Sequence, residues 1–470
     1  MQIVIEMPEE LKGVGEAAQA MIRQVEAVWR STAGGKALNY PEIEQQLAEG
    51  AAALERASHQ VVLQGLDIDQ PRVVIEGKVY GRVGRYEAEY YTMAGPVVVE
   101  RTLYRELGQR NAKTVNAVSL RCGVVGEVWL PRVAKAMAHQ MQQGTSREAE
   151  ATARELGRLP YARSSFESVG HQVGAHYSQL RADVEEVLIE GYAVPQEATS
   201  VSVSLDRVSV PMEEEVPEAE REEQSGRQVC RHFRMAYCAT VTLHDSEGQA
   251  LYTVRYGRMP QGDVDTLCAG LAQDVGTLLR KRPDLQVILL ADGAPELWHL
   301  LERHLNPQTL GVPVHRLVDL WHLLEKLGSA ARVIYGEARA SEILQGWRLR
   351  LLNCAGSIPE ILQALYDSGK EEVSVGQSRP VHEAITYLEN HCERMNYAWA
   401  RRQGLPVGSG NIEATCKTLV AIRMKRAGSR WKEETGEHIL HLRALALSDR
   451  WDAAMALTLQ PLRKAVRIAA

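Results

Sequence analysis

The spacing of hydrophobic positions changes several times along the chain, and each change marks a predicted element. Apolar residues recur every three or four positions from Leu11 to Trp29 and again over 41–63, which predicts two amphipathic helices. From Arg72 to Tyr104, short β-branched and aromatic runs are punctuated by glycines. This pattern predicts a small antiparallel sheet.

Two short helices are predicted next, at 146–157 and 165–177. Each opens with a capping-box pattern, Thr-x-x-Glu148 and Ser-x-x-Glu167, in which a hydroxyl and a carboxylate satisfy free amides at a helix start. The turn between them makes the pair resemble a helix-turn-helix that contacts DNA, although any helical hairpin has the same pattern. The candidate DNA contacts here are Arg158 and Arg163.

Between about 200 and 335, strands alternate with helices. Three strands in hairpin order, a helix and then further strand–helix steps predict a mixed five-stranded sheet. An acidic stretch at 213–223 reads as a solvated loop. The predicted strands are 201–210, 229–243, 250–258, 285–291 and 312–318, with helices at 263–281, from Pro295 and from Trp321.

The rest of the chain is predicted to be helical from about 337 to 405, with a last capped helix from near Ser409. We therefore expect a multidomain α+β protein with an α/β core. Its predicted regions are an N-terminal helical region, a small sheet, a helix-turn-helix-like region, the first part of the core, a helical insertion, and the final core helix with the C-terminal helices. Their boundaries are 1–70, 71–135, 136–195, 196–336, 337–405 and 406–470.

Composition adds little to this picture beyond what it excludes. Apolar residues make up 45% and charged residues 24%, which is typical of a soluble globular protein, and the formal net charge of −6 means that any nucleic-acid footprint must be local. No apolar run approaches the roughly 18 residues of a membrane span, and the first residues lack a signal-peptide layout. Seven scattered cysteines without a Cys-x-x-Cys argue against a disulfide framework or a zinc site. We expect a cytoplasmic protein with no membrane partner.

Two aspartates occupy positions, inside or at the end of predicted strands, where a carboxylate needs an explanation. Asp292 ends the apolar run that begins at Leu285, as expected of a buried parallel strand, and ligands of open α/β sheets bind at such strand ends. A simple Asp-Gly turn is the alternative. Asp206 lies inside a strand, where a buried carboxylate would need a charge partner. An edge-strand aspartate facing water is the alternative.

Glu413 follows the segment Val-Gly-Ser-Gly-Asn-Ile and falls in the first turn of the last helix, which Ser409 or Asn411 can cap. A surface pair with Lys417 is the alternative. Taken together, the two aspartates and this glutamate supply hard oxygen ligands suited to Mg²⁺ or Mn²⁺. Two such ions about 3.5–4 Å apart suit an in-line phosphodiester displacement.

A basic stretch follows Glu413 at once, with no acidic residue from 414 to 432. It predicts a surface that tracks DNA phosphates beside the metal site. A solvated helix face is the alternative. The candidate DNA contacts are Lys417, Arg423, Lys425, Arg426, Arg430 and Lys432.

These residues resemble the DDE transposases of bacterial insertion sequences, in the Mutator-like class with an RNase-H-like catalytic core, and within it the ISKra-type group. The likeness covers roughly 200–455. The similar blocks are Ser-Leu-Asp206, Leu-Ala-Asp292-Gly-Ala, Asp319-Leu-Trp-His322, Leu-Pro-Val-Gly-Ser-Gly-Asn-Ile-Glu413, Arg-Met-Lys-Arg-Ala-Gly-Ser-Arg-Trp431 and, further on, His-Leu-Arg-Ala-Leu.

The resemblance implies roles for particular residues. Asp206, Asp292 and Glu413 would hold two catalytic Mg²⁺ or Mn²⁺ ions, with His322 as an auxiliary active-site residue. Trp347, in the insertion, would stack on a displaced base, although a packed core position is the alternative. The paired cysteines of a zinc ribbon that relatives often carry are absent here, and Cys122 stands alone.

The resemblance also implies a reaction and its partners. The enzyme would cut DNA at the element's ends and transfer the freed 3′-hydroxyl to target DNA. Its partners would be double-stranded DNA of the terminal inverted repeats and the target, in the bacterial nucleoid, and bringing two ends together requires at least a dimer. The alternatives are an RNase-H-like nuclease or resolvase without strand transfer, and a catalytically silent DNA-binding protein.

Overall fold

The computed structural model describes residues 6–33, 35, 37–216 and 229–469, and the chain divides into two compact units. One unit holds residues up to Leu180 together with those from Asp452 onward, and the other holds Arg181–Trp451. The chain crosses between them within α6 (Arg163–Gly191) and at the start of α18 (Trp451–Leu459). Each unit contains a five-stranded sheet with helices, which confirms the multidomain α+β class. The six finer predicted regions stay predictions.

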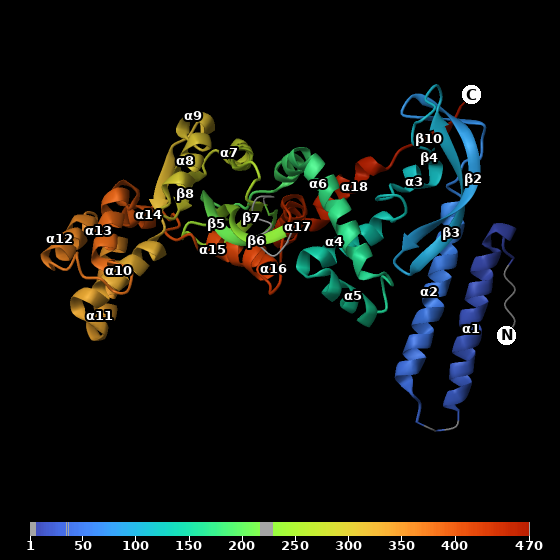
Figure 1. Ribbon diagram of the computed structural model, residues 1–470, viewed down its shortest axis with the longest axis horizontal. Helices are drawn as coiled ribbons and strands as arrows, with labels where there is room; N and C mark the ends of the chain where they lie inside the picture. Colours follow the sequence, from blue (N-terminus) through green and yellow to red (C-terminus); the bar gives the residue numbers. More distant parts are fainter. Residues whose placement is uncertain (1–5, 34, 36, 217–228, 470) are drawn as a thin grey trace. The chain divides into compact units, whose positions relative to one another are not determined.

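The first unit is built on an antiparallel sheet, shown at the upper right of Figure 1. The order is β10-β1-β2-β3-β4, so a segment near residue 467 forms one edge, which the sequence pattern did not predict. Glu76 and Gly77 both have positive φ, as a two-residue hairpin turn between β1 and β2 requires. The strands are β1 (Arg72–Ile75), β2 (Lys78–Thr92), β3 (Gly95–Glu106), β4 (Val115–Asn116) and β10 (Val466–Ile468).

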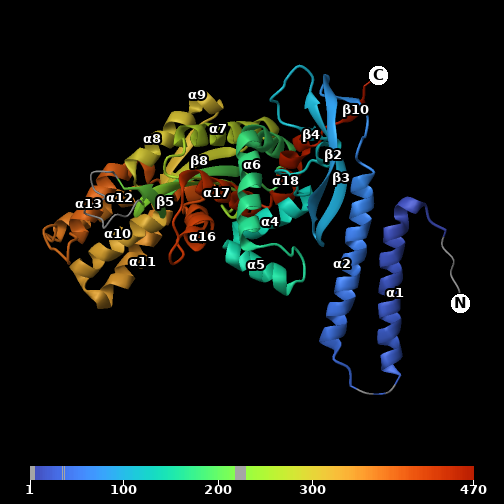
Figure 2. The same ribbon diagram turned by 45° about the vertical axis from the view of Figure 1, so that its right-hand side comes forward.

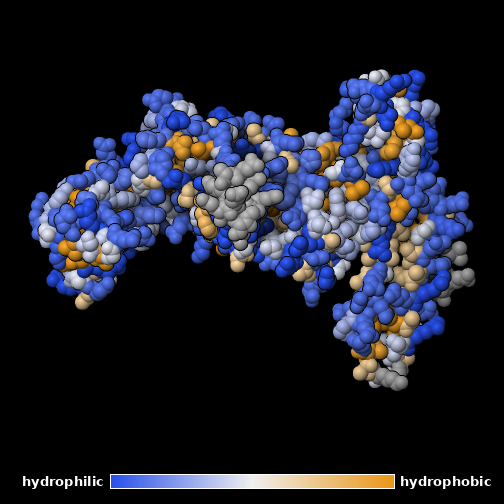
Figure 3. Space-filling model, in the orientation of Figure 1, coloured by the Kyte–Doolittle hydropathy of each residue, from blue (hydrophilic) through white to orange (hydrophobic). Residues whose placement is uncertain are grey.

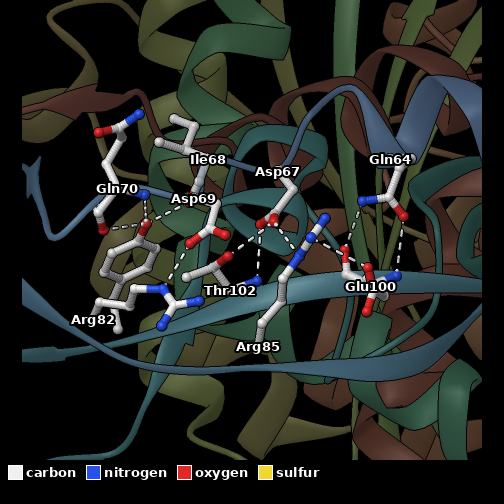
Figure 4. Close-up of polar contacts among 10 residues, drawn as sticks. Gln64, Asp67, Ile68, Asp69, Gln70, Arg82, Arg85, Glu100 and Thr102 are labelled. Carbon is white, nitrogen blue, oxygen red and sulfur yellow. Dashed lines mark hydrogen bonds and ion pairs between the residues drawn. The ribbon is translucent and has the colours of Figure 1, made fainter. Parts of the chain in front are cut away.

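The loop after α2 is fastened to this sheet by polar contacts (Figure 4). The Asp67 carboxylate accepts hydrogen bonds from the backbone amide and hydroxyl of Thr102, each 2.9 Å long. Arg82 pairs with Asp69 at 2.6 Å, and Arg85 lies 3.7 Å from Asp67. Because the loop after α2 is joined to β2 and β3 at several points, these contacts fix its path from the helix to β1.

Two long helices confirm the predicted N-terminal pair, and they form the hairpin below the sheet in Figures 1 and 2. The first keeps several apolar side chains exposed, among them Ile22 and Trp29, and Figure 3 shows apolar residues at the surface of this hairpin. The helical elements of this unit are η1 (Glu9–Leu11), α1 (Lys12–Thr32), α2 (Tyr40–Gln64), α3 (Ala117–Cys122), α4 (Pro131–Gln143), α5 (Ser146–Glu155) and η5 (Gln460–Leu462), with parts of α6 and α18.

The two predicted capping boxes have different outcomes. The box at Thr145 and Glu148 is confirmed, with both reciprocal hydrogen bonds present at the start of α5. The second is wrong as a helix start, because α6 already begins at Arg163 and so places Ser164 inside its first turn. That helix continues to Gly191, well beyond the predicted end near 177.

The second unit contains the predicted mixed five-stranded sheet. The strand order is β7-β6-β5-β8-β9, with β5, β6 and β7 antiparallel and β8 and β9 parallel to β5. The strands are β5 (Ser200–Glu215), β6 (Val229–His244), β7 (Ala250–Arg258), β8 (Gln286–Ala291) and β9 (Val314–Val318).

The acidic stretch at 213–223 is only partly the loop that its composition predicted. Strand β5 continues through Glu215, and Glu214 pairs with Arg234 on β6, with 2.6 Å between Nε and Oε1. Residues 217–223 lie outside the described residues. Strand pairing overrides the local acidic composition because each added residue gains backbone hydrogen bonds to β6.

Helices cover both faces of this sheet (Figure 2). Along β5 the apolar side chains switch from odd-numbered to even-numbered positions, so the two halves of the strand place apolar residues on opposite faces. Val203 and Leu205 pack in a core with α7, whereas Val210 and Met212 pack against α15 and α17. The covering helices are α7 (Val264–Lys281), α8 (Pro295–His304), α15 (Gly410–Thr415), the π-helix η4 (Cys416–Ala421), α16 (Ile422–Met424) and α17 (Glu433–Leu447).

The predicted insertion is helical, as expected. Trp347 is only 8% exposed and makes an edge contact with Tyr335, so it packs in the core. Of the helices within the described ranges, none is long and apolar enough to cross a membrane. The helical elements of the insertion are α11 (Glu337–Asn353), α12 (Ser357–Asp367), α13 (Pro380–His391), η3 (Cys392–Arg394) and α14 (Tyr397–Arg402). Two further helices, α9 (Pro307–Leu310) and α10 (Leu320–Tyr335), precede it.

Candidate active site at the carboxyl edge of the second sheet

Three aspartates lie at one edge of the second sheet because three neighbouring strands present them there. The parallel register pairs Val203 with Leu289, and continuing it by three residues brings Asp206 level with Asp292. Asp319 directly follows β9, and its amide donates to the Ala291 carbonyl at 2.9 Å. This is the edge at which open α/β sheets bind ligands.

The carboxylates of Asp206 and Asp292 are close enough to influence each other. Burial, reinforced by the negative charge of Asp206, raises the pKa of Asp292, while the Ala294 amide at 2.9 Å from Oδ1 acts in the opposite direction. Asp206 accepts hydrogen bonds from the Arg207 amide at 2.6 Å and from the Cys416 thiol at 3.3 Å. Asp292 thus makes the Asp-Gly turn and also belongs to an acidic pair.

Asp319 connects this edge to two later segments. One carboxylate oxygen caps α10 by accepting from the amides of Trp321, at 2.5 Å, and His322, at 3.1 Å. The other accepts from both the amide and the hydroxyl of Ser409. Burial alone would raise the pKa of Asp319, but these hydrogen bonds and the His322 side chain outweigh burial and lower it.

His322 is held as a cation at the same edge. Its Nδ1 lies 3.7 Å from Oδ1 of Asp319, and this carboxylate, helped by Asp292, raises the pKa of His322 to about 9. The side chain keeps 46% of its surface exposed. A protonated imidazole beside Asp292, open to solvent, is suited to contact an anion such as a phosphate.

Glu413 lies shortly after Ser409, which is anchored to Asp319. It occupies the first turn of α15, which packs on β5 and β6, and its side chain is exposed. The predicted side-chain cap is wrong for Ser409: its hydroxyl donates to Asp319 and makes no capping hydrogen bond on α15. The lysine alternative is not realised either, since no ion pair joins Glu413 to Lys417 in the described part of the chain.

The acids fit a divalent cation in part. Asp206 and Asp292 place two like charges together, and a cation would relieve the repulsion that raises the pKa of Asp292. Within the described ranges, however, no three His, Cys, Asp or Glu side chains lie close enough to hold a metal ion as they stand. Asp206 and Asp292 therefore supply only part of a ligand set as they stand.

Two residues of the insertion contact this edge and were missed by the sequence analysis. A Cβ added at Gly293 would lie 2.5 Å from the Tyr387 ring and 2.8 Å from Nε2 of His391, so both side chains of α13 rest on the backbone next to Asp292. Burial, with the negative charges of Asp292 and Asp319, raises the pKa of Tyr387. No local pattern in α13 separates these residues from ordinary core positions.

The predicted DNA-contacting residues differ in how exposed they are and in whether they are engaged by other side chains. Four of the basic residues after Glu413 are exposed, namely Lys417, Lys425, Arg430 and Lys432, while Arg426 is half-buried. Arg423 is instead buried, and its guanidinium lies 5.0 Å from the ring centre of Trp431. In the first unit Arg163 is exposed, whereas Arg158 is engaged by Glu55 in two hydrogen bonds of 2.8 and 3.0 Å.

Comparison with known proteins gave a structural likeness of low similarity. No protein-family model and no curated protein matches the chain. Among solved structures, a Drosophila P element transposase strand transfer complex aligns with a TM-score of 0.35 and 13% identity, covering 67% of this chain and 92% of that chain. At this score the likeness supports no functional argument, which must come from the site.

Proposed function

We propose that this protein is a DNA transposase that cuts DNA at the ends of a mobile element and joins those ends to target DNA. The observation that carries the proposal is the juxtaposition of Asp206 and Asp292 on adjacent strands of the mixed sheet, at the edge to which Asp319 fastens the helix bearing Glu413. The alternative environments for these acids, an edge strand or an isolated turn, do not account for that convergence.

Asp206, Asp292 and Glu413 would hold two Mg²⁺ or Mn²⁺ ions. When bound, such ions would neutralise phosphate charge and activate the attacking oxygen. The residues themselves supply the rest of the site: the carboxylates recruit the cations, and His322 offers a proton-bearing cation to a phosphate oxygen. The exposed Lys417, with the other basic residues of 414–432 that reach the surface, would follow the DNA backbone.

The reaction would consist of two displacements at the same acids. In the first, water attacks a phosphodiester at the element's end, which breaks one P–O bond and releases a 3′-hydroxyl. In the second, that hydroxyl attacks a target phosphodiester and forms a new P–O bond as another breaks. Since two ends must meet, we propose that at least two copies assemble on the terminal inverted repeats.

The test uses the purified full chain with Mg²⁺ or Mn²⁺ and a labelled duplex carrying the inverted repeats that flank the gene. We expect cut and joined products with the wild type and at least a hundredfold loss with Asp206→Asn or Asp292→Asn, because a carboxamide is a poor ligand for these ions. Asp284→Asn is the matched control, since Asp284 is an exposed aspartate that pairs with Arg282 before β8 begins.

The other outcomes separate the rival functions. Cutting without joining would identify a nuclease or resolvase. Binding of the repeats without either product, in the wild type and the variants alike, would identify a DNA-binding protein without catalysis.

A further inference from the structure

A cavity of about 700 Å³ opens in the second unit beside the candidate active site. Its walls come from the β6–β7 turn, the start of α10, the α11 helix and the segment 405–411. It contains Trp321, the neighbour of His322, and Asn411, two residues before Glu413. Residues that line the cavity are therefore close in sequence to residues of the proposed catalytic edge. The size of the cavity falls within the usual range of small-ligand sites.

Trp321 presents an aromatic ring in this cavity. Its amide is bound to Asp319, yet the residue keeps 51% of its surface exposed, which is unusual for a tryptophan. Gly408 sets the position of the ring: a Cβ there would lie 2.8 Å from both Cδ1 and Nε1 of the indole. Only glycine therefore allows the indole to lie where it does.

Two arginines accompany the ring. The guanidinium of Arg348 lies 5.1 Å from the ring centre of Trp321, and its buried Nε has no hydrogen-bond partner among the described residues. Arg401 is exposed and donates to Asn353 at 2.7 Å. The one acidic residue lining the cavity in the described part is Glu247.

The buried His244 does not alter this charge balance. It contacts Ser202 at 2.8 Å, and burial lowers the pKa of its imidazole to about 4, so it is neutral near pH 7. The cavity therefore combines an exposed aromatic face with an excess of positive charge. A planar group attached to an anion matches both features.

We propose that this cavity binds an unpaired nucleotide of single-stranded DNA, with its base stacked on Trp321 and its phosphates contacted by Arg348 and Arg401. Single-stranded DNA is favoured over duplex because the faces of paired bases are already stacked on their neighbours and cannot cover an indole. The inference rests on the proposed function for its substrate class and adds a separate binding site to it.

The test measures binding by the full chain in EDTA, so that no cutting occurs. The probe is a fluorescein-labelled 12-nucleotide strand of mixed sequence, followed by fluorescence anisotropy. We expect Trp321→Ala to weaken binding about tenfold, with Trp321→Phe retaining most of the affinity because stacking survives. Tyr366→Ala is the matched control, since Tyr366 is an exposed aromatic residue of the same unit that does not line the cavity.

Two further measurements make the test specific. Arg401→Ala should weaken binding and reduce the slope of log affinity against log salt by about one, as loss of one phosphate contact requires. Quenching of 2-aminopurine placed within the strand should be present in the wild type and Trp321→Phe and absent in Trp321→Ala. A duplex of the same length should bind both wild type and Trp321→Ala equally.

Unchanged affinity of Trp321→Ala for the single strand, or an equal loss with duplex DNA, would overturn the inference. Because binding is measured without metal, its result is independent of catalysis. A protein that binds the strand through Trp321 but neither cuts nor joins would leave this site standing and remove the proposed function. Cutting and joining by the wild type together with full strand affinity in Trp321→Ala would remove only this site.

Discussion

Asp319 shows how one buried side chain can organise the segments around it. Its two oxygens cap α10 and hold Ser409, so the helices that carry His322 and Glu413 both begin at this carboxylate. It is 2% exposed, and each of its hydrogen bonds favours the charged form. The consequence for His322 can be measured through stability.

We expect the stability contributed by His322 to depend on pH. Its pKa is raised from 6.5 to about 9, so the folded protein binds this proton more tightly than the unfolded chain does. The contribution is therefore complete below pH 6.5 and disappears as pH rises through about 9. In EDTA, the free energy of unfolding of the wild type should exceed that of His322→Gln at about pH 6, and the difference should shrink by about pH 9.5.

The control removes the partner carboxylate. In an Asp319→Asn background, where asparagine can still cap α10, the effect of His322→Gln should change much less with pH, because only the smaller influence of the other carboxylates remains. A wild-type difference that is the same at both pH values would contradict the pairing of His322 with Asp319.

At the scale of elements, the insertion is joined to the catalytic edge by close packing. Helix α13 rests on Gly293, so the segment after Asp292 has no room for a side chain. Gly293→Ala should lower the free energy of unfolding by about 1–3 kcal/mol through overpacking against Tyr387 and His391. Adding Tyr387→Ala should give less than the sum of the two single losses, because it removes the clashing ring.

Urea unfolding of the four proteins in this cycle provides the measurement. Gly270→Ala in α7 is the control, because nothing lies within 4 Å of the position that its Cβ would take. Alanine is the better helix former there, so no loss is expected. Strict additivity of Gly293→Ala and Tyr387→Ala would show that the helix does not press on this turn.

A second element-level contact involves Trp431 and the end of β5. Its amide donates to the Pro211 carbonyl at 3.0 Å, its own carbonyl accepts from Glu213 at 2.8 Å, and Arg423 stacks on its ring. We expect Trp431→Ala to cost about 2–4 kcal/mol in urea unfolding, with Trp431→Phe losing less. Lys417→Ala, at an exposed position, should stay within about 0.5 kcal/mol of the wild type, and an equally small effect of Trp431→Ala would contradict this contact.

The sequence predicted elements whose signals are local and missed contacts made over distance. The hairpin order of β5 to β7 and the capping box at Thr145 were readable because their determinants lie within a few residues. The cap expected from Ser409 failed because its hydroxyl bonds to Asp319, far away in the chain. Arg423 was assigned to the surface because its charge gave no sign of the stack on Trp431.

The candidate site was likewise predictable only in part. Asp206 and Asp292 could be found because each acid interrupts or ends an apolar strand. Tyr387 and His391 could not, since their place beside Asp292 depends on how α13 folds back over the sheet. Whether Glu413 completes a metal site stays a prediction.

On the scale of the whole molecule, the first unit is assembled from both ends of the described chain. Strand β10 pairs with β1, with Val73 opposite Ile468 and Ile75 opposite Val466. The Lys464 amide also donates to the Leu120 carbonyl at 2.8 Å. These contacts protect the edge of β1, where Val73 is fully buried.

Removing residues 464–470 should therefore loosen the first sheet and leave the second unit unchanged. We expect faster hydrogen exchange of the backbone amides in β1 and β2, because the pairing with β10 and its burial are lost. The amides of β8, in the other unit, serve as the internal control. Unchanged exchange in β1 would show that β10 adds nothing to the sheet.

The pairing of β10 with β1 also sets an order for folding during synthesis. The ribosome synthesises β1 early and β10 only after the entire second unit. The first sheet therefore lacks one strand during most of translation. During that interval the open edge of β1 offers backbone groups to any neighbouring chain. Chains whose translation stops before residue 466 would keep the edge of β1 unpaired. Such chains would be prone to aggregation and proteolysis.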